Sequence, residues 1–213
     1  MTSTLHLVRH GEVENPDHVV YADLQEFRLS SIGEVQAEEA AAFLADRPIS
    51  AVCASPLTRA VQTARTIAAP HGLEIEVVEG LTEFGLSKRW RGVRWEELDT
   101  HFPGELDAYL AHPWDLPFSP ESLEEMTNRM GAAIRNRAGA HPDGDLVVVS
   151  HQDPVQAARF LLTGRDFFSF GDDKPDHAEV ITLKPGVPWR EASRWRPTTT
   201  GVTFPPPARE AEA

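Results

Sequence analysis

The sequence predicts an α/β protein, specifically a three-layer α/β/α sandwich with a mainly parallel sheet. Short apolar runs alternate along the chain with longer segments in which apolar residues recur at helical spacing. Strands separated by helices pair in parallel, and the crossover helices then cover both faces of the sheet. The composition, 41% hydrophobic and 25% charged, is that of an ordinary globular protein, and we expect one domain over residues 1–196.

The first half of the chain contains three expected strands, at residues 4–9, 49–55 and 73–79. The segments between them, 29–48 and 56–72, each have one apolar helical face. These faces are formed by Ala37, Ala40, Ala41 and Leu44 in the first helix and by Ala60, Ala64, Ile67 and Ala68 in the second. We expect Ser55 to cap the second helix, Pro56 to occupy its first position and Gly72 to follow its end.

The second half begins with residues 84–119, which are rich in Trp, Pro and Gly and contain at most short helices. We expect them to form a lid or an excursion over one edge of the sheet. A long helix follows over about 120–138, with its inner face formed by Leu123, Met126, Met130 and Ile134. The run at 145–151 is the most strand-like in the chain, and 154–164 predicts a helix that ends at Gly164.

The last part of the chain contains two further expected strands, at 177–183 and 189–195, whose direction the sequence leaves open. From Pro197 the sequence is too poor in apolar residues to pack. Residues 197–213 therefore predict a flexible C-terminal tail.

Charge and composition exclude several classes of function. The net charge of −13 opposes binding to nucleic acid or to an anionic membrane, so an anionic substrate needs a locally positive pocket. No membrane span is visible, and Arg9 follows Met1 too closely for the apolar core of a secretory signal, so we expect a cytoplasmic protein. Cys53 is the only cysteine, which excludes an internal disulfide and a cysteine-built zinc site.

Unusual residues stand where three of the expected strands end. The first strand ends in Arg9, His10 and Gly11, the second leads to Arg59, and the strand at 145–151 ends on His151. The carboxyl ends of parallel strands lie at one edge of a sheet, where helix N-termini also point. Guanidinium groups match phosphate oxygens in bidentate fashion, so the sequence predicts a site for a phosphate-sized dianion at this edge.

Four ordered segments then carry a family resemblance: "LVRHGEVEN", "SPLTRAVQTA", "LTEFGLSKRWRG" and "VVVSH". Together with "FRLSSIGEVQA", which resembles the recurrent link into the first helix, they make the chain similar to the histidine phosphatase superfamily, also called the phosphoglycerate mutase-like family. The resemblance covers residues of about 4–165.

The resemblance implies that His10 is a nucleophile that carries a transient phosphoryl group, and that Glu83 is the proton donor. It implies that the phosphate is held by Arg9, Asn15, Arg59 and His151. The residue types suit these roles, because a neutral imidazole is a competent nucleophile at pH 7 and a carboxyl group can protonate a departing alkoxide. Gly11 would let the backbone come close to the phosphate.

The function expected on this basis is that of a metal-independent phosphatase acting on a small phosphorylated metabolite, without a cofactor. A phosphoglycerate-type phosphomutase and a catalytically dead module that binds phospho-ligands are the alternatives. The candidates for the substrate pocket are Tyr21, Trp90, Arg91 and Gln152. Where the family usually has a small residue after the second histidine, this chain has Gln152 and then Asp153, whose side chain we expect to turn away and cap the next helix. The oligomeric state is left open.

Parts of the same region could in principle have two other functions. A metal site could be formed by His10, Glu12, Glu14, Asp17 and His18, but their spacing matches no standard ligand motif. The segment 87–97 combines tryptophans with basic residues and fits either a substrate wall or a structural loop. Nucleic-acid binding by this segment is opposed by the overall charge.

Overall fold

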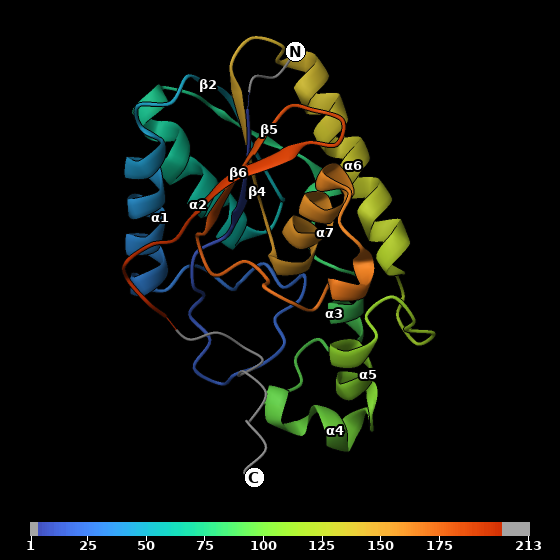
Figure 1. Cartoon of the computed structure of the whole chain (residues 1–213). Coiled ribbons are helices and arrows are strands. Elements are labelled where there is room, and N and C mark those ends of the chain that lie inside the picture. Colours follow the sequence, from blue (N-terminus) through green and yellow to red (C-terminus); the bar gives the residue numbers. More distant parts are fainter. Residues whose placement is uncertain (1–3, 202–213) are drawn as a thin grey trace.

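The computed structural model describes residues 4–201 and is built around a six-stranded sheet in the order β3-β2-β4-β1-β5-β6 (Figure 1). The strands are β1 (Leu5–Arg9), β2 (Ile49–Ala54), β3 (Ile75–Val77), β4 (Asp145–Ser150), β5 (Val180–Lys184) and β6 (Arg190–Trp195). Strands β1 to β4 pair in parallel, whereas β5 pairs antiparallel with both β1 and β6. The predicted, mainly parallel α/β sheet is therefore confirmed, with an antiparallel pair at one edge.

Four helices cover the two faces of this sheet (Figure 1). Each helix packs against the side chains that point to its face, because side chains alternate between the two faces along a strand. Helices α1 (Ser31–Leu44) and α2 (Thr58–Ala68) pack on the face that contains Val8, Val52 and Val149. Helices α6 (Leu123–Ala140) and α7 (Gln152–Thr163) pack on the opposite face, with Leu7 and Val148. Within residues 4–201, none of the helices is long and apolar enough to cross a bilayer.

The predicted helical faces are all buried, and both glycine stops take the left-handed conformation, at Gly72 (φ 65°) and Gly164 (φ 68°). The predicted cap of α2 is wrong. The helix begins at Thr58 after Leu57, and the hydroxyl of Ser55 instead lies 2.7 Å from Nε2 of His151. Ser55 therefore contacts His151 at the carboxyl edge of the sheet instead of capping α2.

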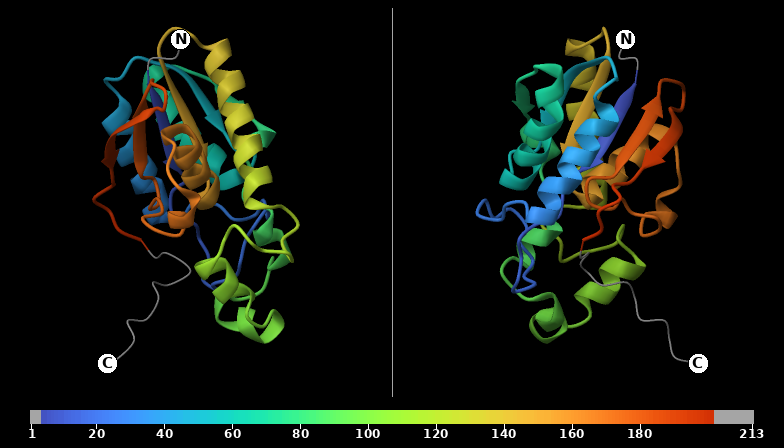
Figure 2. Two further views of the ribbon diagram at one scale, coloured as in Figure 1. Left: turned by 45° about the vertical axis from the view of Figure 1, so that its right-hand side comes forward. Right: turned by 90° about the vertical axis from the view of Figure 1, so that its left-hand side faces the viewer.

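The remaining helices are short and lie mostly in the predicted excursion. They are η1 (Ala69–His71), η2 (Glu79–Leu81), α3 (Leu86–Arg89), η3 (Trp95–Glu97), α4 (Leu98–His101), α5 (Glu105–Ala111) and η4 (Phe167–Ser169). Helices α4 and α5 lie beyond one end of the sheet in both views of Figure 2. Trp90, Leu98 and Tyr109 form a third apolar cluster with Phe160 of α7, so the excursion has its own core. It forms a packed wall above the carboxyl edge of the sheet.

The expectation of a flexible tail from residue 197 is wrong for its first part. Thr198 and Thr199 donate hydrogen bonds to the carboxylate of Glu39 on α1, and the carbonyl of Thr199 accepts one from Gln36. These polar contacts need no apolar side chains, which is why composition did not reveal them. The rest of the predicted tail, 202–213, lies outside the described residues.

A close backbone contact joins the end of β1 to the start of α1. A Cβ placed on Gly11 would lie 2.5 Å from the carbonyl oxygen of Gly33, and one placed on Gly33 would lie 2.0 Å from that of Glu12. Neither carbonyl belongs to a flexible side chain that could turn aside. Gly11 therefore has no room for a side chain, because its backbone packs against Gly33 in the first turn of α1.

We expect Gly33→Ala to lower the free energy of unfolding by about 2 kcal/mol or more, because the backbone must shift to admit the methyl group. Urea denaturation measures the change. Gly139→Ala is the matched control, since nothing lies within 4 Å of a Cβ at Gly139. That control should be neutral or stabilising by up to about 1 kcal/mol, because alanine is the better helix former. Equal stabilities of the two variants would contradict the contact.

Candidate active site

The structure brings the predicted histidines and arginines together at the carboxyl edge of the sheet. Arg9 and His10 follow β1, Arg59 lies in the first turn of α2, and His151 follows β4. The rings of His10 and His151 are 5.1 Å apart between centroids, and Nε of Arg59 donates to Nε2 of His10 at 3.3 Å. All four side chains are buried, with at most 3% of each exposed. Pairing of β1 with β4, and of β4 with β2, places these strand ends side by side.

His10 is held in one tautomer. Its Nδ1 lies 2.7 Å from the carbonyl oxygen of Gly11, and because a carbonyl only accepts, Nδ1 carries the proton and Nε2 keeps its lone pair. Burial lowers the pKa of His10 well below its usual value, and the positive charge of Arg59 adds to the effect. The imidazole is therefore neutral at pH 7, with an available nitrogen.

Three buried nitrogen atoms around His10 have no hydrogen-bond partner: Nε of Arg9, Nη1 of Arg59 and Nδ1 of His151. Each side chain is anchored by another atom, through bonds to the carbonyl of Pro175 (3.0 Å), the carbonyl of Ala22 (2.6 Å) and the hydroxyl of Ser55 (2.7 Å). Buried donors without partners cost roughly 1–3 kcal/mol each, so they are uncommon in a folded protein. Their grouping here forms a cradle for an anion.

Glu83 follows η2 and faces the same histidine pair. Its Oε1 accepts from the backbone N–H of Phe84 at 2.8 Å, and its Oε2 lies 3.7 Å from Nδ1 of His151. The guanidinium of Arg129 donates to the carbonyl oxygen of Glu83 at 2.9 Å and so holds the loop in place. Burial raises the pKa of Glu83 to about 7, and the negative charge of Asp153 adds to the rise. A proton is thus available on this carboxyl near neutral pH.

The side chain of Asp153 lines the cavity and does not cap the helix as expected. It lies within the first turn of α7 and accepts from the hydroxyl of Tyr109 at 2.8 Å and from Nζ of Lys174 at 2.7 Å. Lys174 also donates to that hydroxyl at 2.6 Å. The carboxylate of Asp153 is thereby paired with a lysine from a distant loop and attached to the excursion.

His177 was missed by the sequence analysis. Nη2 of Arg9 donates to its Nε2 at 2.7 Å, and its ring lies 5.8 Å from that of His10. It precedes β5, and because β5 runs antiparallel to β1, its beginning lies beside the end of β1. Ala178, at φ 52°, donates its N–H to the carbonyl of His10. If the direction of β5 were known from the sequence, His177 could be predicted to lie beside the end of β1.

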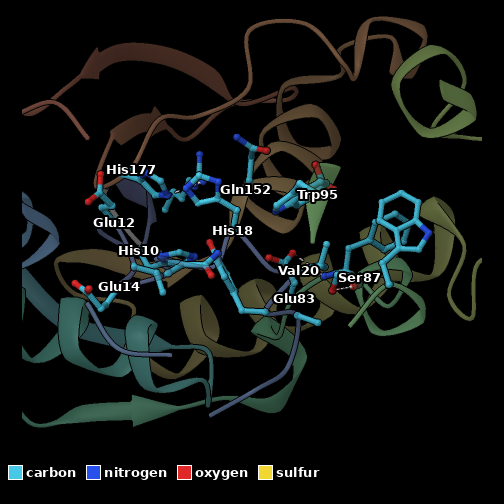
Figure 3. Close-up of a pocket in the computed structure, with 18 of the residues that line it drawn as sticks. His10, Glu12, Glu14, His18, Val20, Glu83, Ser87, Trp95, Gln152 and His177 are labelled. Atoms are coloured by element: carbon cyan, nitrogen blue, oxygen red, sulfur yellow. Dashed lines mark hydrogen bonds between the residues drawn. The ribbon is translucent and has the colours of Figure 1, made fainter. Parts of the chain in front are cut away.

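A cavity of about 310 Å³ opens above the histidines, and Figure 3 shows His10, Glu83, Gln152 and His177 around it. Three of the pocket candidates, Tyr21, Trp90 and Gln152, are among its lining residues. Arg91 is not, and its prediction as a pocket residue is wrong. Its exposed guanidinium pairs with Asp23 at 3.1 Å on the outer surface.

Asn15 lines the cavity, but its amide group is used within its own loop. Nδ2 donates to the carbonyl of Val19 at 2.9 Å, and Oδ1 accepts from the N–H of Val19 at 3.1 Å. One of the two N–H donors of Nδ2 is therefore used within the loop, which holds the amide group in place. Among residues 4–201, no three His, Cys, Asp or Glu side chains are placed to hold a metal ion together.

Comparison with known sequences gives this arrangement a family. The sequence model of the histidine phosphatase superfamily (branch 1) matches residues 5–195. The chain belongs to this superfamily. An uncharacterized protein of Mycobacterium tuberculosis is 40% identical to this chain over 172 residues. The matched region covers 76% of this chain and 79% of that protein.

Two further matches have named activities. Phosphoserine phosphatase 1 of Hydrogenobacter thermophilus is 31% identical over 178 residues, covering 82% of this chain and 84% of that protein. The fold matches a mycobacterial glucosyl-3-phosphoglycerate phosphatase whose structure was determined with VO3, at a TM-score of 0.80. That match covers 90% of this chain and 98% of the other. At 24% identity it supports the fold only and not an activity.

We expect Asp153→Asn to lower the pKa of Glu83 below about 7, because the substitution removes a neighbouring negative charge. The pKa should stay above that of an ordinary glutamate, since burial is the larger cause. An NMR titration of the carboxyl carbon measures it. Asp143→Asn, an exposed change before β4 and so at the other edge of the sheet, is the control. An unchanged Glu83 pKa in the first variant would contradict the assigned interaction.

Proposed function

We propose that this protein is a metal-independent phosphomonoester hydrolase that acts through a phosphohistidine intermediate on a small phosphorylated metabolite. One observation carries the proposal. A neutral histidine, whose Nε2 keeps its lone pair and accepts only from Arg59 among the contacts of the described residues, lines a cavity and lies beside three buried nitrogen atoms that have no hydrogen-bond partner. This set of groups can accept a phosphate dianion and present a nucleophile to its phosphorus.

In the first step, Nε2 of His10 attacks phosphorus and the bond from phosphorus to the ester oxygen breaks. Glu83 donates its proton to the departing alkoxide, which leaves as an alcohol. The imidazole becomes positively charged as it takes the phosphoryl group. Its Nδ1–H bond to the carbonyl of Gly11 supports that charge and keeps the ring in place.

In the second step, water attacks phosphorus and the bond to Nε2 breaks. The Glu83 carboxylate left by the first step takes a proton from the attacking water, which regenerates the acid. Inorganic phosphate is released and His10 returns to its neutral state. Arg9 and Arg59 offset charge on the equatorial oxygens in both steps and His151 lies beside them as a neutral polar group, because all three side chains are anchored before the substrate binds.

Two alternatives make different predictions in solution. A phosphomutase returns the phosphoryl group to a bound hydroxyl acid and depends on a bisphosphoglycerate for turnover. A module that only binds phospho-ligands needs no acid of raised pKa, so the environment of Glu83 favours an enzyme. Steady release of inorganic phosphate without added bisphosphoglycerate would support hydrolysis over both alternatives.

We expect His10→Ala to reduce hydrolysis of an aryl phosphate to the uncatalysed background, because the nucleophile is lost. In the wild type, quenching with alkaline detergent after a short incubation with a ³²P-labelled ester should leave protein-bound label that is stable to alkali and lost on treatment with acid, as a phosphohistidine is. His112→Ala, an exposed histidine of the excursion, is the matched control and should keep both properties. Full activity of His10→Ala would refute the proposal.

We expect Glu83→Gln to slow alkyl phosphates by about 10²-fold or more and aryl phosphates much less, since a phenolate leaves with little help from an acid. In the wild type, kcat/KM for an alkyl ester should fall as pH rises through about 7, because the Glu83 proton is then lost. A pH profile of each variant with both esters measures this. Equal losses on the two esters would argue against Glu83 as the acid.

A further inference from the structure

We propose that the leaving group of the substrate has no carboxylate and is an uncharged alcohol with a flat apolar surface, about the size of one ring. This inference rests on the proposed phosphatase function and specifies its substrate class. It comes from the charges and apolar surfaces of the cavity wall above the phosphate cradle.

The charged residues of the wall are mostly acids. Within the part of the chain that the structure describes, the cavity-lining residues with a permanent positive charge are limited to Arg9, which belongs to the cradle. The lining acids are Glu12, Glu14, Glu83 and Asp153. Figure 3 shows Glu12 and Glu14 at the side of the cavity away from Val20 and Ser87. The wall therefore offers no described cation to a second anionic group.

The basic residues near the cavity are used elsewhere. Arg91 pairs with Asp23 at 3.1 Å, and Lys88 approaches the same carboxylate at 3.9 Å. Arg94 donates through Nε to the carbonyl of Asp17 at 3.0 Å. All of these contacts are made by residues that do not line the cavity. The positive charge that the sequence concentrates in 88–94 thus holds the excursion against the loop after β1.

Lys174 comes nearest to supplying a cation, but it is fully engaged. Its Nζ contacts both the carboxylate of Asp153 and the hydroxyl of Tyr109, and it lies 4.4 Å from the centre of that ring. Its charge is paired with that of Asp153, so the ammonium group is already engaged. A substrate carboxylate would have to compete with a fixed carboxylate for this ammonium group.

The charge balance follows from these contacts. Arg9 and Arg59 match the two charges of a phosphate dianion, and the histidines around them are neutral because burial lowers their pKa values. A third negative charge on the substrate would lose water and face the acids Glu12 and Glu14, and the described wall has no Lys or Arg side chain beyond Arg9 to pair with it. An uncompensated charge is costly in a partly enclosed cavity, where the effective dielectric constant is below that of water.

The apolar part of the wall is largely aromatic, and it lies beside uncharged polar residues that include Asn15, Ser87 and Gln152. The apolar part is formed by Val20, Tyr21, Ala22, Phe84, Leu86, Trp90 and Trp95. Val20, Ala22, Phe84, Leu86 and Trp90 belong to the cluster that packs the excursion onto the sheet, which gives the wall a fixed shape. A volume of about 310 Å³ is at the lower end for ligand sites, so phosphate and one ring fill it.

The test uses pairs of esters that differ by one carboxylate. Phenyl phosphate is compared with 4-carboxyphenyl phosphate, and glycerol 3-phosphate with 3-phosphoglycerate, all with the wild-type protein. We expect kcat/KM to be at least about tenfold higher for the member without the carboxylate in each pair. A ratio of one, or a preference for the carboxylate, in both pairs would overturn the inference.

A binding measurement separates this inference from the proposed function. Phenylphosphonate and 4-phosphonobenzoate have no ester bond to hydrolyse, so calorimetry reports affinity alone. Tighter binding of phenylphosphonate by about tenfold supports the inference even if no ester is turned over, which would refute the proposed function. Equal or tighter binding of 4-phosphonobenzoate would overturn the inference even if phosphatase activity is present.

A charge reversal tests the wall directly. Glu14 is exposed and lines the cavity, and Glu14→Lys should raise the relative affinity for 4-phosphonobenzoate about fivefold or more, with little effect on phenylphosphonate. Glu74→Lys makes the same change in net charge before β3, at the opposite edge of the sheet, and should leave the ratio unchanged. The same ratio in both variants would show that the wall does not set the selectivity.

Discussion

The hydrogen bond from Nδ1 of His10 to the carbonyl of Gly11 is the interaction on which the site depends. It leaves Nε2 as the nitrogen with a lone pair, and it fixes the ring over the end of β1. The backbone that makes it is itself held from two sides, because His10 donates its N–H to Ser150 of β4 and Gly11 packs on Gly33 of α1. A sheet register and a close contact between two glycines therefore orient one imidazole.

The second requirement is that the buried polar side chains around His10 remain incompletely paired. Arg9, Arg59 and His151 each use one part of the side chain for anchoring and keep another nitrogen free. Such an arrangement is destabilising by itself, so the stability must come from elsewhere, chiefly from the two apolar layers of the sheet and the third core under the excursion. An anion that supplies the missing hydrogen bonds removes this cost and binds for that reason.

The excursion has two roles in this arrangement. It supplies the apolar wall of the cavity, and through Tyr109 it fixes Asp153, whose charge helps to keep the proton on Glu83. Lys174 keeps that acid from repelling a phosphate. Glu83, which we propose as the proton donor, and the proposed substrate wall are thus linked through one hydrogen-bonded group, so changes in the excursion should affect both.

The sequence by itself determined the alternation of strands and helices, the helical faces, and the residues that stand at the strand ends, His10, Arg59 and His151 among them. These follow from periodicity and from the geometry of parallel sheets, which are local or general. Only the tertiary structure decided the direction of β5, which brings in His177, and the partners of Asn15, Arg91 and Asp153. Those contacts join segments far apart in the chain, as Asp153 does with Tyr109, and the side-chain orientations that make them are set by packing, which no local pattern records.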